Sequence, residues 1–482
     1  MTRFLTVLGF SLFFVAGVDA QFSKSYQAIP VLDTIPADIH ENMKARLNRD
    51  NGSMEATTAN KREATYMKSL NKERFEHIVD NFNKDKFIVD SELNQYLNLI
   101  LENIRKGNPG LPLDIHVYLY RSSVPNAICY GEGTIVFSTS LLARLESEDQ
   151  VASVLSHELA HQIKGHGDQT MKALTSLNFD KKINKEIKQI KSDSYGKYSK
   201  IKNLTEALEL SRTRHSRFYE FEADSVGLGL LLNTKYNSIA AVRSMEILDS
   251  IDRPVYTKPL DLKKYFNFKD YPFKASWATY IKSDNWHKSL EVADSLKTHP
   301  NCKQRATALQ RQLTRVSKWP ASYTASSDDD VFTFIRTTSQ FETLESEYHF
   351  KQYGKAMFRA LVMLEQYPDN IYLHAMVGKC LYKLYEYQKH HLLGNVLELP
   401  DPRFEENYDR FLTFFHKLRL SELENLAYHY VTTKNESYFL DENFLYTTWL
   451  CSTLPSSKLG HEKVKDEYRE RFPNGRYLKQ MK

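Results

Sequence analysis

Intervals of three and four residues separate the apolar side chains of Leu93, Leu97, Ile100, Leu101 and Ile104. This spacing predicts a helix that begins at residue 90 or 91 and ends at the Asn-Pro-Gly sequence of residues 108–110. Residues 21–85 are polar and rich in Asn, Lys and Glu, with a helical stretch expected over 60–81. We therefore predict an N-terminal polar, helical segment over 21–85 and a second domain that begins near residue 86.

Two short segments beyond this helix have strand character. Residues 115–119 alternate between the two faces of a strand, and residues 134–138 are a short β-branched run that follows a glycine turn. Ser147, with Gln150 three residues later, is typical of a capping box that opens the next helix. The expected fold class is α+β, mostly helical, with a small sheet and an active-site helix.

From about Asp328 onward, Tyr, Phe and Leu recur in helical patterns. Proline-containing breaks at 366–370 and 398–402 lie 32 residues apart, an interval that resembles tetratricopeptide repeats of about 34 residues. Tyr353, Gly354, Ala356 and Ala360 fit the small-residue positions at which paired repeat helices touch. We expect an all-α, tetratricopeptide-like domain over 330–482, with a surface for a protein partner.

Composition bounds the alternatives. A chain of 482 residues with 41% hydrophobic content can bury two or three domains, and a net charge of +5 gives no reason to expect nucleic-acid binding. Eight lysines lie between residues 181 and 202, where Ile183, Ile187 and Ile190 have helical spacing. This pattern favours an amphipathic helix with a solvated basic face over a nucleic-acid or membrane surface.

The first twenty residues have the layout of a secretory signal. Arg3 is followed by an apolar run from Leu5 to Val18, and small residues end at Ala20. The run is shorter than the roughly twenty residues that cross a bilayer as a helix. The sequence thus predicts a signal peptide over 1–20, an exported protein that is periplasmic or secreted, and no stable transmembrane anchor after cleavage. An uncleaved anchor is the alternative.

A candidate metal site lies in the helix that Ser147 opens, where residues 157–161 read His-Glu-Leu-Ala-His. Residues four apart share one helical face, so the imidazoles of His157 and His161 can reach one ion. Glu158 projects beside that ion and can accept a proton from its water. A separate apolar stripe of Val151, Leu155, Leu159 and Ile163 is expected to be buried, which argues against ordinary surface histidines.

A catalytic zinc ion needs a third protein ligand and one open position. The strongest candidate for that ligand is Glu220, 59 residues after His161, in the sequence Glu-Phe-Glu-Ala-Asp. Asp224 lies one helical turn later on the same face, where its carboxylate could support a ligand histidine. These residues predict a single zinc ion per chain.

H-E-x-x-H followed by E-x-E-A-D resembles the gluzincin metallopeptidases, which include the CAAX prenyl proteases, the HtpX-like membrane proteases and the soluble, periplasmic BepA-like branch. The resemblance covers about residues 86–310, so we expect a zincin-type peptidase domain over 86–320. It includes Asn126 before the glycine turn, a candidate substrate-binding residue. It also includes His299 and Arg305, whose family counterparts approach the metal. The plan is most similar to the BepA-like branch, which also ends in tetratricopeptide repeats.

The resulting hypothesis is a zinc metalloendopeptidase that hydrolyses extracytoplasmic proteins or peptides, with a role in protein quality control. Glu158 is the expected general base, and His299 and Arg305 are the expected oxyanion stabilisers by resemblance. The segment Thr134-Ile135-Val136 is expected to pair with an extended substrate as an edge strand.

The rival hypothesis is a latent or inactive zinc-site protein that acts as a chaperone-like binding module through its helical repeats. In the BepA-like branch, a histidine in the position of His299 can occupy the open metal site. A purely structural zinc site is less favoured, because Glu158 would then have no role.

Overall fold

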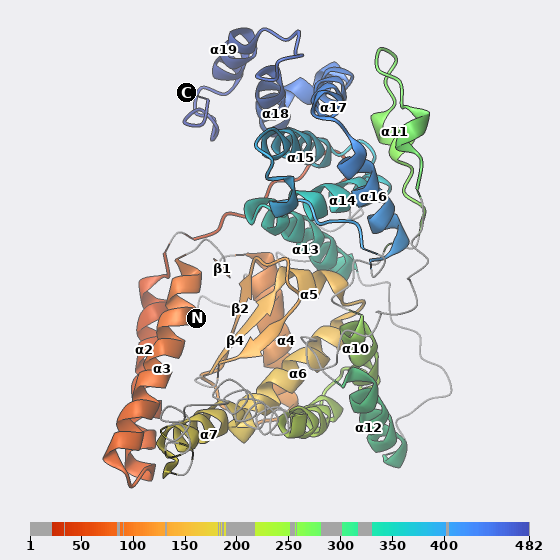
Figure 1. The fold of residues 1–482 in the computed structure, drawn as a ribbon. Coiled ribbons are helices and arrows are strands. Elements are labelled where there is room, and N and C mark those ends of the chain that lie inside the picture. Colours follow the sequence, from red (N-terminus) through yellow and green to blue (C-terminus); the bar gives the residue numbers. More distant parts are fainter. Residues whose placement is uncertain are drawn as a thin grey trace, which may run out of the picture. The chain divides into compact units, whose positions relative to one another are not determined.

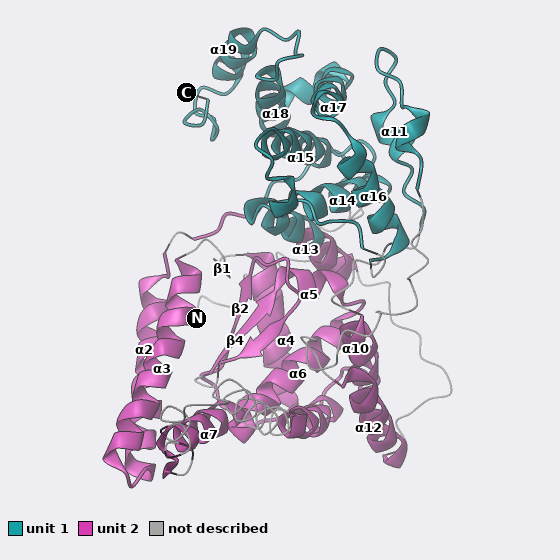
Figure 2. Cartoon of the chain, in the orientation of Figure 1, with its two compact units in different colours: residues 1–28, 253–291, 340–482 teal, residues 29–252, 292–339 magenta. Residues whose placement is uncertain are grey.

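The structure is a computed structural model that describes residues 22–32, 34–83, 87–89, 91–130, 133–181, 217–250, 258–280, 301–316, 330–401 and 404–481, with a few single residues between them. The predicted signal peptide, most of the lysine-rich stretch, and His299 lie outside the described residues. Two compact units make up the chain (Figure 2). One consists of residues 29–252 and 292–339, and the other of residues 1–28, 253–291 and 340–482. We call the first the sheet unit and the second the helical unit.

The sheet unit contains a four-stranded sheet of order β1-β2-β4-β3. The strands are β1 (Phe87–Ile88), β2 (His116–Tyr120), β3 (Ala127–Cys129) and β4 (Thr134–Ser138). β2 and β4 are parallel, whereas β1 and β3 are antiparallel to their neighbours. The expected strands at 115–119 and 134–138 are confirmed. The expectation that 134–138 forms an edge is wrong, because β4 is hydrogen-bonded on both sides, to β2 and to β3, and the edge strands are β1 and β3.

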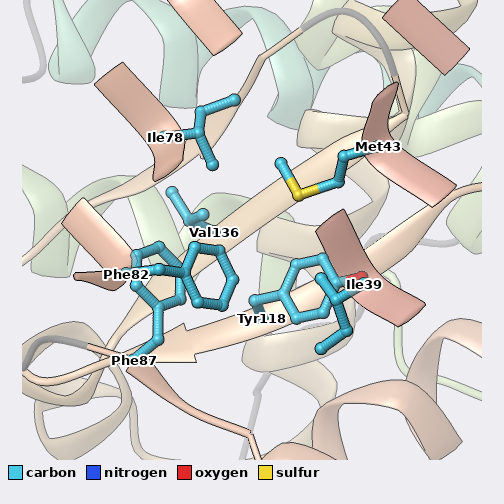
Figure 3. Packing of buried hydrophobic residues seen from close by; sticks show 7 residues of the cluster. All are labelled: Ile39, Met43, Ile78, Phe82, Phe87, Tyr118 and Val136. Carbon is cyan, nitrogen blue, oxygen red and sulfur yellow. The ribbon is translucent and has the colours of Figure 1, made fainter. Parts of the chain in front are cut away.

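Helices cover both faces of this sheet (Figure 1). On one face lies an antiparallel pair, α2 (Ala37–Thr57) and α3 (Lys61–Phe82), whose residues Ile39, Met43, Ile78 and Phe82 pack on Phe87, Tyr118 and Val136 (Figure 3). The expected helix over 60–81 is thus confirmed as α3. Alternate residues of a strand face opposite sides of the sheet, and the side that carries Tyr118 is apolar. Helices α2 and α3 of the polar N-terminal segment bury this side, so the segment packs as part of the same unit as the sheet.

The opposite face carries α4 (Glu92–Gly107) and α6 (Glu148–Lys164). Ser91 caps the start of α4, and the apolar stripe of this helix is buried as the spacing predicts. Ser147 caps α6 by accepting a hydrogen bond from the Gln150 N–H, while the Gln150 side chain accepts from Glu146 instead of closing the box. Val151, Leu155 and Leu159 are buried, but Ile163 in the last turn is 43% exposed, so that part of the predicted stripe is wrong.

The sheet unit contains several further described helices. They are α5 (Thr139–Arg144), α7 (His166–Phe179), a helix at residues 217–232, α10 (Ala240–Asp249), α12 (Cys302–Arg315) and the first half of α13 (Asp330–His349). We call the helix at 217–232 the glutamate helix. Among the described residues, no helix is both long and apolar enough to span a membrane.

The helical unit is built from antiparallel helices without a sheet in its described part. Its main helices are the second half of α13, α14 (Tyr353–Leu364), α15 (Ile371–Lys389), α16 (Glu406–Lys417), α17 (Leu420–Thr432), α18 (Glu442–Ser452) and α19 (His461–Arg471), with the short α11 (Leu262–Phe266). The predicted mostly helical α+β class is confirmed. Ala356 and Ala360 are buried, and Gly354 lies against Leu397. Assignment to tetratricopeptide repeats stays a prediction.

Candidate metal centre

The two histidines of α6 point their Nε2 atoms at one another and at a carboxylate from the glutamate helix. The Nε2 atoms of His157 and His161 are 3.1 Å apart. Glu220 lies 3.6 Å from His157 Nε2 through one oxygen and 3.5 Å from His161 Nε2 through the other. The three residues form a group that could hold a metal ion.

These separations fit a tetrahedral zinc ion. Zinc bonds to imidazole nitrogen and carboxylate oxygen are about 2.0–2.2 Å long, which places adjacent tetrahedral ligands roughly 3.3–3.5 Å apart. The observed distances of 3.1, 3.5 and 3.6 Å bracket that value. Two imidazoles and one carboxylate are also the donor set of known catalytic zinc sites with one open position.

Gly227 explains how the glutamate helix comes close enough to supply Glu220. Glu220, Asp224 and Gly227 lie at i, i+4 and i+7 and therefore share one helical face. A Cβ atom at Gly227 would lie 3.0 Å from both the N and the Cα atom of His157. The two helices thus cross at the turn that carries His157, so closely that a side chain at residue 227 would require them to move apart.

Asp224 and Arg305 form a buried support behind the ligands. Asp224 Oδ1 lies 3.0 Å from Nδ1 of His157, the ring nitrogen that faces away from the ligand cluster. Arg305 on α12 donates from Nε and Nη2 to the two oxygens of Asp224, each at 2.7 Å. Its Nη1 lies 2.8 Å from Glu220, so one guanidinium holds two carboxylates.

The electrostatics of this cluster favour a cation. Burial disfavours ionised Glu220 and Asp224, yet hydrogen bonds and the nearby positive groups hold both pKa values below their ordinary range. Burial also opposes a charge on His157, but hydrogen bonds to Asp224 and Glu220 raise its pKa to about 10. Burial and the charge of His157 lower the pKa of His161 to about 3. The carboxylates therefore stabilise one positive charge at the imidazoles.

Glu158 stands apart from the three candidate ligands. Its Oε2 atom accepts a hydrogen bond of 2.8 Å from the backbone N–H of Cys129 on edge strand β3. Burial raises the pKa of Glu158 above its usual value. A carboxylate whose pKa lies nearer neutrality exchanges protons more readily, as a general base must.

A second-layer histidine escaped the sequence reasoning. Nδ1 of His166 lies 2.9 Å from Nδ1 of His161, and its Nε2 lies 3.1 Å from Glu222. Tyr219 stacks on the His166 ring with centroids 4.5 Å apart, and Lys164 pairs with Glu222 at 2.7 Å. The available signal in the sequence was a third histidine five residues after His161, together with Glu222, the second of the two acids that flank Phe221.

A cavity of about 270 Å³ opens beside the ligands. Asn126 and β3 line one side, and α10 and α12 contribute the apolar Met245, Leu248 and Leu309. Thr134, Ile135 and Val136 are buried in the sheet and do not line it, because β4 lies inside the sheet. In an antiparallel pair, the backbone N–H and C=O groups of successive residues point alternately toward the partner strand and away from it. Asn126 and Tyr130 are hydrogen-bonded to the strand region of β4 through their backbone groups, so the N–H and C=O of Ala127 point away from β4.

Two imidazoles one helical turn apart, a carboxylate from a second helix and a glutamate beside them are the metal-binding arrangement of metallopeptidases. Comparison with known proteins agrees. Residues 91–313 match the model of peptidase family M48, and this similarity supports a metallopeptidase domain in that part of the chain.

One relative is the beta-barrel assembly-enhancing protease of Yersinia pestis, which is 29% identical over 79 residues. The match spans 16% of this chain and 16% of that protein. The similarity agrees with a gluzincin of the BepA-like type.

Proposed function

We propose that the protein is a zinc-dependent metalloendopeptidase of extracytoplasmic proteins, with His157, His161 and Glu220 as zinc ligands. The observation that supports it most is the convergence of the three ligand groups at the spacing of a tetrahedral ion. When bound, zinc would supply a Lewis acid that lowers the pKa of a water molecule and polarises the scissile carbonyl.

Glu158 is the proposed general base. It takes the proton of the attacking water and returns it to the nitrogen of the leaving amine, so that the amide bond breaks with a balanced transfer. The hydrogen bond from the Cys129 N–H fixes its carboxylate on the side of the cavity. Glu158 thereby connects the metal-binding helix to the strand along which a substrate would lie.

We assign substrate pairing to β3 in place of β4. An extended peptide can bond to the backbone of an edge strand, which reads the main chain and leaves side-chain choice to pockets. Ala127 offers its N–H and C=O away from β4, and Asn126 lines the same side of the cavity. The apolar wall at Met245 and Leu248 favours a substrate with an apolar side chain near the cleaved bond.

Arg305 is proposed as a positioning residue, not as a direct oxyanion stabiliser. The Arg305 side chain is 1% exposed, and three of its nitrogens face Asp224 and Glu220. A group held in this way orients the third ligand and the carboxylate behind His157. The role of His299, as stabiliser or gate, stays a prediction.

The test is Glu158→Gln, which keeps the shape of the side chain but removes its basicity. Zinc content should remain near one per chain, while casein hydrolysis should fall by at least ~10²-fold. His157→Ala should lose both zinc and activity. Full activity of Glu158→Gln would exclude the peptidase mechanism, and full zinc content of His157→Ala would exclude the ligand set.

Export and quality control belong to the same proposal. The signal-like residues 1–20 support export, and the name of the Yersinia relative, a beta-barrel assembly-enhancing protease, supports a role in protein quality control. The rival, a latent zinc-site protein that binds partners, predicts intact zinc content with no hydrolysis in either wild type or Glu158→Gln.

A further inference from the structure

Residues 22–28 belong to the helical unit, although the next residues of the chain belong to the sheet unit (Figure 2). They have little regular structure of their own. The segment nevertheless makes buried contacts with α13 and α15 in the helical unit. It therefore occupies a surface formed by residues more than three hundred positions later.

Two aromatic side chains four positions apart anchor the segment. Phe22 is 2% exposed, and its ring stacks on Phe341 of α13 with centroids 5.3 Å apart. Tyr26 stacks on the same Phe341 at 4.4 Å and meets the edge of Tyr372 at 5.4 Å. Aromatic pairs at these separations contribute beyond the area they bury.

The start of α15 binds the backbone between the two anchors. Asn370, which is fully buried, donates from Nδ2 to the carbonyl of Phe22 at 2.6 Å. The N–H of Ile371 donates to the carbonyl of Lys24 at 2.7 Å. The first N–H groups of a helix have no partner within the helix, so a peptide carbonyl satisfies one of them here.

Polar contacts complete the recognition at the end of the segment. The Tyr26 hydroxyl donates to the buried Glu342, and Ser25 donates to Asp441 at 3.3 Å. The side chains of Lys24 and Gln27 are exposed. The helical unit thus contacts the side chains at positions one, four and five of the segment and the carbonyls at positions one and three.

We propose that this surface is a peptide-recognition site of the helical unit, occupied by residues 22–26 of its own chain. Its ligand class is a short peptide with aromatic side chains at the first and fifth positions. Because the covalent link gives the segment a high effective concentration, it fills the site without needing high intrinsic affinity. A separate peptide of the same chemistry binds when the anchors of the resident segment are removed.

The experiment uses residues 21–482, the chain that remains if the predicted signal peptide is removed, and a fluorescent peptide of residues 21–30. The double variant Phe22→Ser/Tyr26→Ser should bind this peptide saturably. Wild type and the matched control Lys24→Ser/Gln27→Ser should bind it at least ~10-fold more weakly, because their sites are filled. A peptide with Phe22→Ser and Tyr26→Ser should lose at least ~10-fold in affinity for the double variant.

A second protein covers the case in which the double variant does not fold. A specific protease site placed within residues 31–36 of the otherwise wild-type chain allows the link to be cut after folding. The cut chain should exchange its segment for the fluorescent peptide and not for the serine-substituted peptide. The proposal is overturned if neither protein takes up the fluorescent peptide, or if both peptides bind equally.

Discussion

Gly227 on the glutamate helix meets the backbone of His157 on α6, and a Cβ atom at residue 227 would lie 3.0 Å from His157 N and Cα. This contact sets the distance between the helix with two proposed ligands and the helix with the third. Gly229, two residues further along, has nothing within 4 Å of its hypothetical Cβ. One helix therefore offers both a test position and its control.

Gly227→Ala should destabilise the sheet unit by about 1–3 kcal/mol and weaken zinc binding, because the added methyl group forces the helices apart. Gly229→Ala should instead stabilise it by about 0.5–1 kcal/mol, the usual preference for Ala over Gly in a helix. Urea unfolding and zinc titration of both variants check this. Equal zinc affinity in the two variants would show that the crossing does not set the site.

Arg305→Met should destabilise the protein by about 3–5 kcal/mol, because Asp224 and Glu220 would remain buried without their shared cation. Arg305→Lys should recover part of the loss, since a lysine supplies charge but no bidentate fork. Thermal unfolding and zinc affinity are the readouts. An Arg305 that served only the oxyanion would lower the rate and leave both readouts unchanged.

Asp224→Asn preserves the shape of the side chain but removes the charge beside His157 Nδ1. Loss of such a support typically lowers metal affinity by about 10–100-fold. Competition with a chromophoric chelator measures the change directly, without an activity assay. Unaltered zinc affinity would mean that Asp224 serves only to hold Arg305.

His166→Asn should lower zinc affinity by about 10-fold or more, because His161 Nδ1 would lose the partner that orients its ring. Glu222→Gln should act in the same direction, and the double variant should lose less than the sum of the two single losses. His349→Asn, at an exposed position of α13, is the control. Additive effects of the two substitutions would contradict a connected His161–His166–Glu222 chain.

His374 predicts a pH dependence in the helical unit. Burial lowers its pKa to about 3, while its ring contacts the Tyr430 hydroxyl and the Pro368 carbonyl. A folded-state pKa below the ordinary value of 6.5 means that the unfolded chain binds a proton first as pH falls. The stability contribution of neutral His374 is therefore present above about pH 6.5 and declines toward pH 3.

The expected slope from this one group approaches 1.4 kcal/mol per pH unit between about pH 6 and 4. Unfolding free energies of wild type and His374→Gln at several pH values check it, with His349→Gln as the exposed control. The His374 variant should be less stable at pH 7 but should lose less stability on acidification. Parallel pH curves for the two proteins would contradict the assignment.

Local sequence determined much of this protein. Apolar intervals predicted α4, the β-branched run predicted β4, and the four-residue spacing of His157 and His161 placed both imidazoles on one face of α6. These features could be predicted because helix period, strand alternation and capping depend on residues within a few positions of one another. The motif with Glu220 also singled out a third ligand, whose place beside the histidines the structure supports.

Tertiary structure decided the rest. β3 lies at an edge of the sheet and β4 lies inside it. This order is set by the hydrogen bonds between strands, and the residue types of one strand do not determine which strands will flank it. The ion pairs of Arg305 with Asp224 and Glu220 form because α12 packs against residues about eighty positions earlier in the chain. Ile163 is exposed because its turn lies beyond the packed part of α6. Residues 22–26 were only a polar segment in the sequence. Their partners at Phe341 and Asn370 become neighbours only when the chain folds, because contacts between distant segments depend on the geometry of the whole unit.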